Sequence, residues 1–115
     1  MTPPDVTQPP PLPGLVQRTV DRLVRAFAPE RILVFGSLAK GTTTLGSDVD
    51  LLVIAYLPGD RSAYRRRARA LAADCFPPVD VVLATPEEIE NAPDAASPFL
   101  ASILGSGVTV YARAA

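Results

Sequence analysis

Three aspartates and a glycine–serine pair are the residues of this chain whose types and spacing could do chemistry. Asp48 and Asp50 stand two residues apart at the start of one apolar run, and Asp80 stands at the start of another. Side chains at i and i+2 of a strand point to the same face, so Asp48 and Asp50 direct two carboxylates to one side of a sheet. If the two runs pair as strands, Asp80 brings a third carboxylate to the same place. Such a group repels itself unless a cation lies within it, and all-oxygen ligands suit Mg²⁺ or Mn²⁺.

The Gly36-Ser37 pair complements the carboxylates. It follows a short apolar run, and glycine lets the backbone approach a ligand closely while serine adds an N–H and a hydroxyl. Donors at a strand-to-helix turn bind the phosphates of a nucleotide, and Lys40 could neutralise a phosphate oxygen. Two divalent ions about 3.5–4 Å apart clamp the attacking and leaving oxygens of phosphoryl transfer. Together these residues suit a nucleoside triphosphate bound with Mg²⁺.

Composition excludes other chemistries. The 115 residues contain no His and one Cys, Cys75, which rules out Ser-His-Asp catalysis, His-ligated zinc and an internal disulfide. The formal charge of −1 argues against binding to nucleic acid or a membrane surface through bulk charge. We see no signal peptide and no apolar stretch near the roughly 18 residues of a membrane span, so the cytoplasm is the expected location.

Hydrophobic periodicity predicts the elements that position these residues. Six of the thirteen prolines fall within residues 1–14, which we interpret as a disordered leader before a single domain over 15–115. We expect an α+β fold of the αβαβαβ type, a small mixed sheet with helices packed on it. The expected strands cover residues 31–35, 49–56, 79–84 and 108–111. One helix is expected after Gly14, a second over 61–73, a third beginning at Thr85-Pro86 and a fourth over 97–104, which Gly105 ends. Residues 38–47 are expected to form a loop.

Several charged residues have a plain structural interpretation. The arginines between 65 and 69 are expected to form a solvated helix face, with a contact surface for an acidic partner or RNA as the alternative. Glu87, Glu88 and Glu90 are expected to supply favourable charge near the start of a helix. Tyr64 is assigned to the core, and Cys75 to the end of a helix as a small apolar residue.

The segments 35–41 (Phe-Gly-Ser-Leu-Ala-Lys-Gly) and 47–53 (Ser-Asp-Val-Asp-Leu-Leu-Val) resemble the DNA polymerase beta-like nucleotidyltransferases, and more narrowly the minimal nucleotidyltransferase domains. The resemblance covers about residues 15–84 and implies the polymerase beta palm-like fold. It implies that Gly36, Ser37 and Lys40 hold the nucleotide phosphates. Asp48 and Asp50 would ligate the metals and contact the nucleotide through them, and Asp80 would complete one metal site and help to deprotonate the acceptor.

The same resemblance suggests a reaction and a partner. Minimal nucleotidyltransferases often pair with a HEPN-domain protein, which predicts transfer of AMP from ATP to a hydroxyl of a HEPN-type toxin, with this chain as its antitoxin. A binding module that neutralises its partner by complex formation is the alternative, and transfer to a small molecule is a weaker one. Only 35 residues follow Asp80 (115 − 80), so we expect the acceptor to come from a partner. A homo-oligomer is a further option. Many relatives carry Arg at the position of Leu38. The absence of this Arg predicts weaker phosphate binding.

Overall fold

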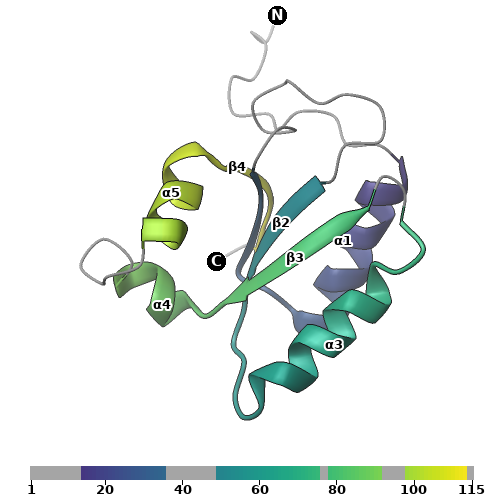
Figure 1. Cartoon of the computed structure of the whole chain (residues 1–115), viewed down its shortest axis with the longest axis horizontal. Coiled ribbons are helices and arrows are strands. Elements are labelled where there is room, and N and C mark those ends of the chain that lie inside the picture. Colours follow the sequence, from purple (N-terminus) through teal and green to yellow (C-terminus); the bar gives the residue numbers. More distant parts are fainter. Residues whose placement is uncertain (1–13, 36–48, 76–77, 92–97, 114–115) are drawn as a thin grey trace, which may run out of the picture.

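The computed structural model describes residues 14–35, 49–75, 78–91 and 98–113. Helices and strands are interleaved along these ranges and build one sheet with helices against it (Figure 1). The order is α1 (Gly14–Phe27), β1 (Arg31–Phe35), β2 (Val49–Ile54), α3 (Arg61–Leu71), β3 (Val79–Ala84), α4 (Pro86–Asn91), α5 (Pro98–Ser106) and β4 (Val108–Ala112).

The sheet is mixed, with the strand order β3-β2-β1-β4. β1 pairs antiparallel with both β2 and β4, whereas β2 and β3 run parallel and are joined through α3. A parallel pair requires such a crossover, because a short hairpin can join only antiparallel strands. The predicted α+β class is therefore confirmed, as is the pairing of the two strands that carry the aspartates.

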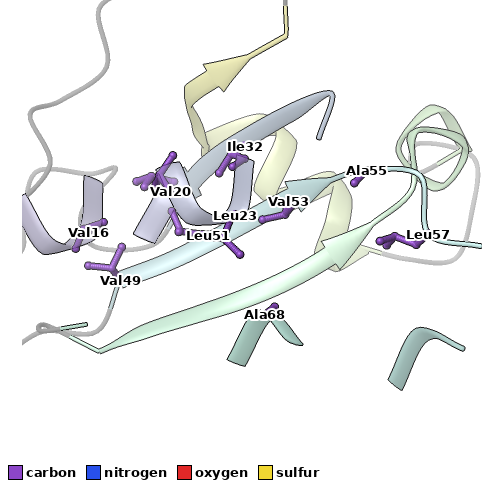
Figure 2. Close-up of a cluster of buried hydrophobic side chains, with 11 residues drawn as sticks. Val16, Val20, Leu23, Ile32, Val49, Leu51, Val53, Ala55, Leu57 and Ala68 are labelled. Carbon is purple, nitrogen blue, oxygen red and sulfur yellow. The ribbon is translucent and has the colours of Figure 1, made fainter. Parts of the chain in front are cut away.

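Apolar side chains cover both faces of the sheet, as expected for central strands with helices on each side. Alternate residues of β2 point to opposite faces, so Val49, Leu51 and Val53 join one cluster while Leu52 and Ile54 join another. The first cluster packs against α1 and α3 and contains the side chains shown in Figure 2. The second packs against α4 and α5. Figure 1 shows α1 and α3 together on one side and α4 and α5 on the other.

Contacts between α1 and α3 fix the first helical layer. The rings of Phe27 and Tyr64 lie 6.2 Å apart, and the Tyr64 hydroxyl donates to the Pro58 carbonyl over 2.8 Å. Arg22 of α1 forms a 2.7 Å ion pair with Asp74, just beyond α3. Tyr64 thus packs partly into the core, as does Cys75, which is half-buried against the same cluster.

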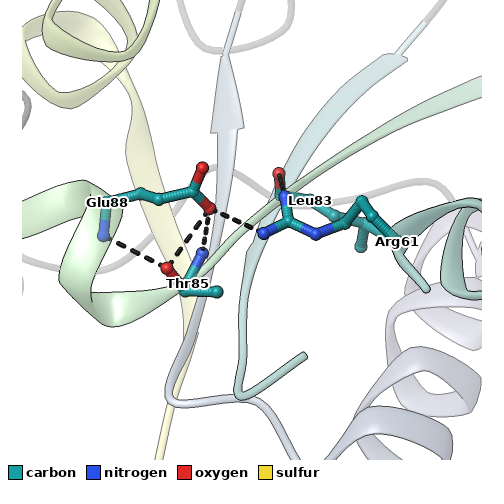
Figure 3. A network of polar contacts seen from close by, with 4 residues as sticks. All are labelled: Arg61, Leu83, Thr85 and Glu88. Carbon is teal, nitrogen blue, oxygen red and sulfur yellow. Dashed lines mark hydrogen bonds and ion pairs between the residues drawn. The ribbon is translucent and has the colours of Figure 1, made fainter. Parts of the chain in front are cut away.

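A polar network ties α3 and α4 to the end of β3 (Figure 3). The Thr85 backbone N–H donates to Glu88 over 2.9 Å, and the Glu88 N–H donates to the Thr85 hydroxyl over 3.1 Å, which is a capping box. Arg61 donates to the same carboxylate over 3.0 Å. Glu88 therefore does more than supply charge near the start of α4, because it links two helices.

Several element boundaries differ from the prediction: α3 ends at Leu71 rather than at residue 73, and β4 ends at Ala112 rather than at residue 111. β2 ends at Ile54 rather than at residue 56, and the Tyr56 side chain is 80% exposed. α5 continues through Gly105 and ends at Ser106, and the N–H of the next residue, Gly107, donates to the Ile103 carbonyl over 2.6 Å. A glycine is tolerated inside a helix at a modest cost, so Gly105 was the wrong stop signal. The predicted leader falls almost entirely, and the predicted loop over 38–47 entirely, outside the described residues.

The two glycines near the end of α5 predict stability changes of opposite sign. A Cβ at residue 107 would lie 2.7 Å from the Ile103 carbonyl oxygen, whereas one at residue 105 would meet nothing within 4 Å. Gly107→Ala should lower the free energy of unfolding by about 1–3 kcal/mol through overpacking. Gly105→Ala should raise it by about 0.5–1 kcal/mol, because alanine loses less backbone entropy in a helix. Urea denaturation measures both, and equal stability of the two variants would contradict the packing at Gly107.

The Glu88 network predicts a pH effect. The Thr85 N–H, aided by the Arg61 guanidinium, lowers the pKa of Glu88 below its ordinary value of 4.5 against the opposing effect of partial burial. A lowered folded-state pKa gives stabilisation that is complete above the unfolded-state pKa and is lost as the pH falls through the folded-state pKa. Between neutral pH and about pH 3, Glu88→Gln should therefore lose less stability than the wild type.

The control for this effect is Glu87→Gln, which changes an exposed carboxylate on the same helix that makes no ion pair in the described ranges. Its unfolding free energy should follow the wild-type pH profile. A Glu88→Gln profile that also matches the wild type would show that the network contributes nothing to acid sensitivity.

Candidate active site

Three strand ends meet at one edge of the sheet. β1 runs antiparallel to β2, so the last residues of β1 lie beside the first residues of β2, and the parallel β3 begins at the same edge. In Figure 1 these ends lie toward the top of the sheet. Phe35, the last residue of β1, and Val49, the first residue of β2, both belong to this edge. The edge is thus the point at which the segment containing the Gly-Ser pair leaves and re-enters the sheet.

Asp50 and Asp80 are direct neighbours at this edge. They are paired residues in the parallel register of β2 and β3, and neighbouring strands lie about 4.8 Å apart. Paired residues of adjacent strands point to the same face, so both carboxylates lie on the side of the sheet that α4 and α5 cover. Asp50 is half-buried and Asp80 is exposed. The two carboxylates therefore share one partly solvated site.

This pair of carboxylates fits a hard divalent cation. Two like charges on adjacent strands repel each other, and a cation between them removes the repulsion. Carboxylate oxygens are the ligands that Mg²⁺ takes, and it typically uses only one or two of them from the protein. Within the described ranges, no cluster of three or more Asp, Glu or Cys side chains is arranged to hold a metal. Asp48, the third predicted ligand, lies outside those ranges.

The other predicted site residues are Gly36, Ser37 and Lys40. They too lie outside the described residues, so their roles remain predictions. The structure thus brings together Asp50 and Asp80, two of the three predicted carboxylates.

Two arginines of α3 lie near this edge, although their sequence pattern is typical of a solvated helix face. Arg65 and Arg69 line a cavity of about 90 Å³ together with Val79, Asp80 and Val81. Both side chains remain largely exposed, so the solvated interpretation holds in part. Their i, i+4 spacing places them on the same side of the helix, which was the signal that they could act together. Their guanidiniums add positive charge close to the strand that carries Asp80.

Comparison with solved structures supports the fold. A crystal structure of a toxin–antitoxin with AMP-PNP has a chain 26% identical to this one, with a TM-score of 0.58 over 83% of this chain and 72% of that chain. A crystal structure of a mutant toxin–antitoxin pair, MntA-HpeT, has a chain 26% identical, with a TM-score of 0.55 over 84% and 72%. A Sulfolobus solfataricus protein described as a nucleotidyltransferase is 19% identical, with a TM-score of 0.57 over 86% and 78%, and shows similarity of fold alone.

Among curated proteins, none matches the chain significantly. None of the helices in the part of the chain that the structure describes combines the length and apolar character needed to cross a bilayer.

The family comparison covers the region that forms the sheet and its helices. The family model described as nucleotidyltransferase domain matches residues 16–104, which include every strand end of the candidate site. The resemblance to minimal nucleotidyltransferases is thus confirmed, and so is the expected fold. Because the match spans most of the chain and the architecture agrees with it, this protein belongs to the nucleotidyltransferase domain family and is a transferase.

Proposed function

We propose that this chain transfers AMP from ATP to a hydroxyl group of a partner protein, and that it acts in this way as the antitoxin of a HEPN-type toxin. The observation that carries the proposal is the pairing of Asp50 with Asp80 at one edge of the sheet, in a member of a nucleotidyltransferase family. Two adjacent carboxylates on one face are what a metal-bound triphosphate requires.

The solved relatives support the choice of nucleotide and partner. One is a toxin–antitoxin with AMP-PNP, an analogue of ATP, and another is the MntA-HpeT toxin–antitoxin pair. The similarity to each of them covers more than four-fifths of the length of this chain. ATP is accordingly the proposed substrate and a toxin protein the proposed acceptor.

Asp48, Asp50 and Asp80 are the proposed ligands of Mg²⁺, with Mn²⁺ as the alternative. When bound, the cation neutralises charge on the phosphates and lowers the barrier to displacement at phosphorus. The fit rests on the donor set, because Asp50 and Asp80 present oxygen ligands on one face and the sequence contains no His.

The protein's own groups bind and orient the substrates. We assign the backbone N–H groups and hydroxyl of Gly36-Ser37, together with Lys40, to the β- and γ-phosphates. The acceptor oxygen attacks the α-phosphorus, the bond from that phosphorus to the bridging oxygen of the β-phosphate breaks, and pyrophosphate leaves in line. Asp80, the more exposed carboxylate, receives the proton of the acceptor hydroxyl. The product is a phosphodiester between AMP and the partner protein.

The metal assignment predicts a stability effect that does not depend on activity. Mg²⁺ at ten times its Kd should raise the free energy of unfolding of the wild type by about 1.4 kcal/mol, because only the folded state forms the site. Asp80→Asn should reduce this gain, as it removes one ligand. Asp21→Asn, which changes an exposed carboxylate on α1, is the matched control and should keep the full gain. A full Mg²⁺ effect in Asp80→Asn would exclude Asp80 as a ligand.

The transfer reaction is tested with ATP labelled at the α-phosphate, Mg²⁺ and the partner that co-purifies with the chain. Label should become covalently attached to the partner, and Asp50→Asn should slow this by about a hundredfold or more through lost electrostatic stabilisation. Asp21→Asn should label the partner at the wild-type rate, since its side chain lies on the helix packed against the other face of the sheet.

Complex formation is measured in parallel, so that loss of transfer can be separated from loss of binding. Equal labelling by the wild type and Asp50→Asn would overturn the enzymatic proposal. Neutralisation of the toxin by Asp50→Asn at wild-type strength, with an intact complex, would instead identify the chain as a binding module.

A further inference from the structure

An aromatic pair lies on the same face of the sheet as the carboxylates. Phe99, on the first turn of α5, is 55% exposed, although Leu100 and Ile103 of the same helix pack into the second hydrophobic cluster. Its ring meets the ring of Phe35 edge to face, with centroids 6.1 Å apart and planes at 83°. Exposing a large apolar ring to water is unfavourable in free energy, and a ligand that covered the ring would remove this penalty.

The strand register connects this pair with the candidate active site. Phe35 is the partner of Asp50 across β1 and β2, and Asp50 is the partner of Asp80 across β2 and β3. The three side chains therefore form a row on one face of the sheet, and the Phe99 ring contacts Phe35 at the β1 end of this row. A triphosphate bound beside the two aspartates has its nucleoside free to extend along the row toward the rings.

Aromatic rings are the surfaces on which nucleobases stack, and each such contact contributes about 1–3 kcal/mol. The Phe99 ring contacts the Phe35 ring edge to face, while about half of Phe99 remains accessible to solvent. Stacking needs a flat and exposed surface, and Phe99 provides both.

From this geometry we infer that Phe99, supported by Phe35, stacks against the base of the nucleoside triphosphate, and that this contact makes purine nucleotides the preferred substrates. The inference rests on the proposed function, because it takes the phosphates to bind beside Asp50 and Asp80. A purine presents a larger face than a pyrimidine, so ATP and GTP bind more tightly than CTP and UTP. Phe99 is thus a determinant of nucleotide specificity.

Calorimetric titration of the full chain with Mg²⁺ and nucleotides tests this inference. The probes are ATP, CTP and inorganic tripolyphosphate, which has the phosphates without a base. Phe99→Leu keeps an apolar side chain against the second cluster but removes the aromatic face, and Phe99→Ala removes both. Tyr56→Ala is the matched control, because Tyr56 is 80% exposed and follows the opposite end of β2.

Phe99→Leu should weaken ATP binding by about tenfold, in keeping with a loss of about 1.4 kcal/mol of stacking. It should weaken CTP binding less and leave tripolyphosphate binding unchanged, while Tyr56→Ala binds all three as the wild type does. Phe99→Trp keeps an aromatic face and should bind ATP at least as tightly as the wild type does. This pattern would establish the stacking contact.

Other outcomes overturn the inference in distinguishable ways. If the wild type binds ATP and Phe99→Leu binds it equally well, the inference fails and the proposed function stands. If Phe99→Leu weakens tripolyphosphate as much as ATP, the ring supports the phosphate site and does not contact the base. If variants at Phe99 lose the partner protein but keep ATP, the ring is a docking surface. If the wild type binds neither ATP nor tripolyphosphate, the proposed function fails as well.

Discussion

The parallel register between β2 and β3 is the constraint on which the candidate site depends. It pairs Asp50 with Asp80, and the same register pairs the apolar residues that follow each of them. A slip of one residue would turn every side chain of β3 to the other face and would separate the two carboxylates. It would also place Val79, Val81 and Leu83 on the wrong side of the sheet, away from the cluster beneath α1 and α3. The packing of the core therefore holds the site together.

The helices enforce this register from both faces. α1 and α3 bury Val49, Leu51 and Val53, while α4 and α5 bury Leu52 and Ile54. Beyond the other end of β3, the capping box at Thr85 and Glu88 binds Arg61 of α3, so the crossover helix is fixed relative to the strand it leads into. At the edge that carries the aspartates, Asp50 is half-buried and Asp80 is exposed, so both carboxylates are partly solvated.

Much of this arrangement could be predicted from the sequence, because it depends on local signals. The periods of the apolar residues predict the strands and most of the helices, and the acidic residues at two strand starts predict that their carboxylates meet if the strands are neighbours, as β2 and β3 are. The place of β4 could not be read in this way. Nothing in residues 108–111 specifies that they pair with β1 rather than with β3. That choice depends on α5, which carries the chain across the sheet.

The residues near the site that the sequence did not predict are likewise brought there by tertiary packing. Phe99 sits in a short apolar helix and resembles a core residue in sequence, and only its exposure in the fold distinguishes it. Arg65 and Arg69 resemble other arginines on α3, and only the packing of that helix against β3 brings them to the strand of Asp80. The end of α5 was misplaced because a glycine occurs inside a helix as well as just beyond its end, and only the close approach of Ile103, Leu33 and Val34 distinguishes Gly107 from Gly105. Tertiary contacts of this kind are not encoded in a local pattern.

The proposed cation site requires Asp50 and Asp80 to bind one ion together at the edge of the sheet. Crystals grown with Mn²⁺ and an ATP analogue test it directly, because the anomalous scattering of manganese locates the ion without assumptions about the protein. If the two residues do so, an anomalous peak should lie at coordination distance, about 2.0–2.3 Å, from carboxylate oxygens of both aspartates and beside the phosphates. A nucleotide bound elsewhere, or a manganese peak that neither aspartate contacts, would contradict it.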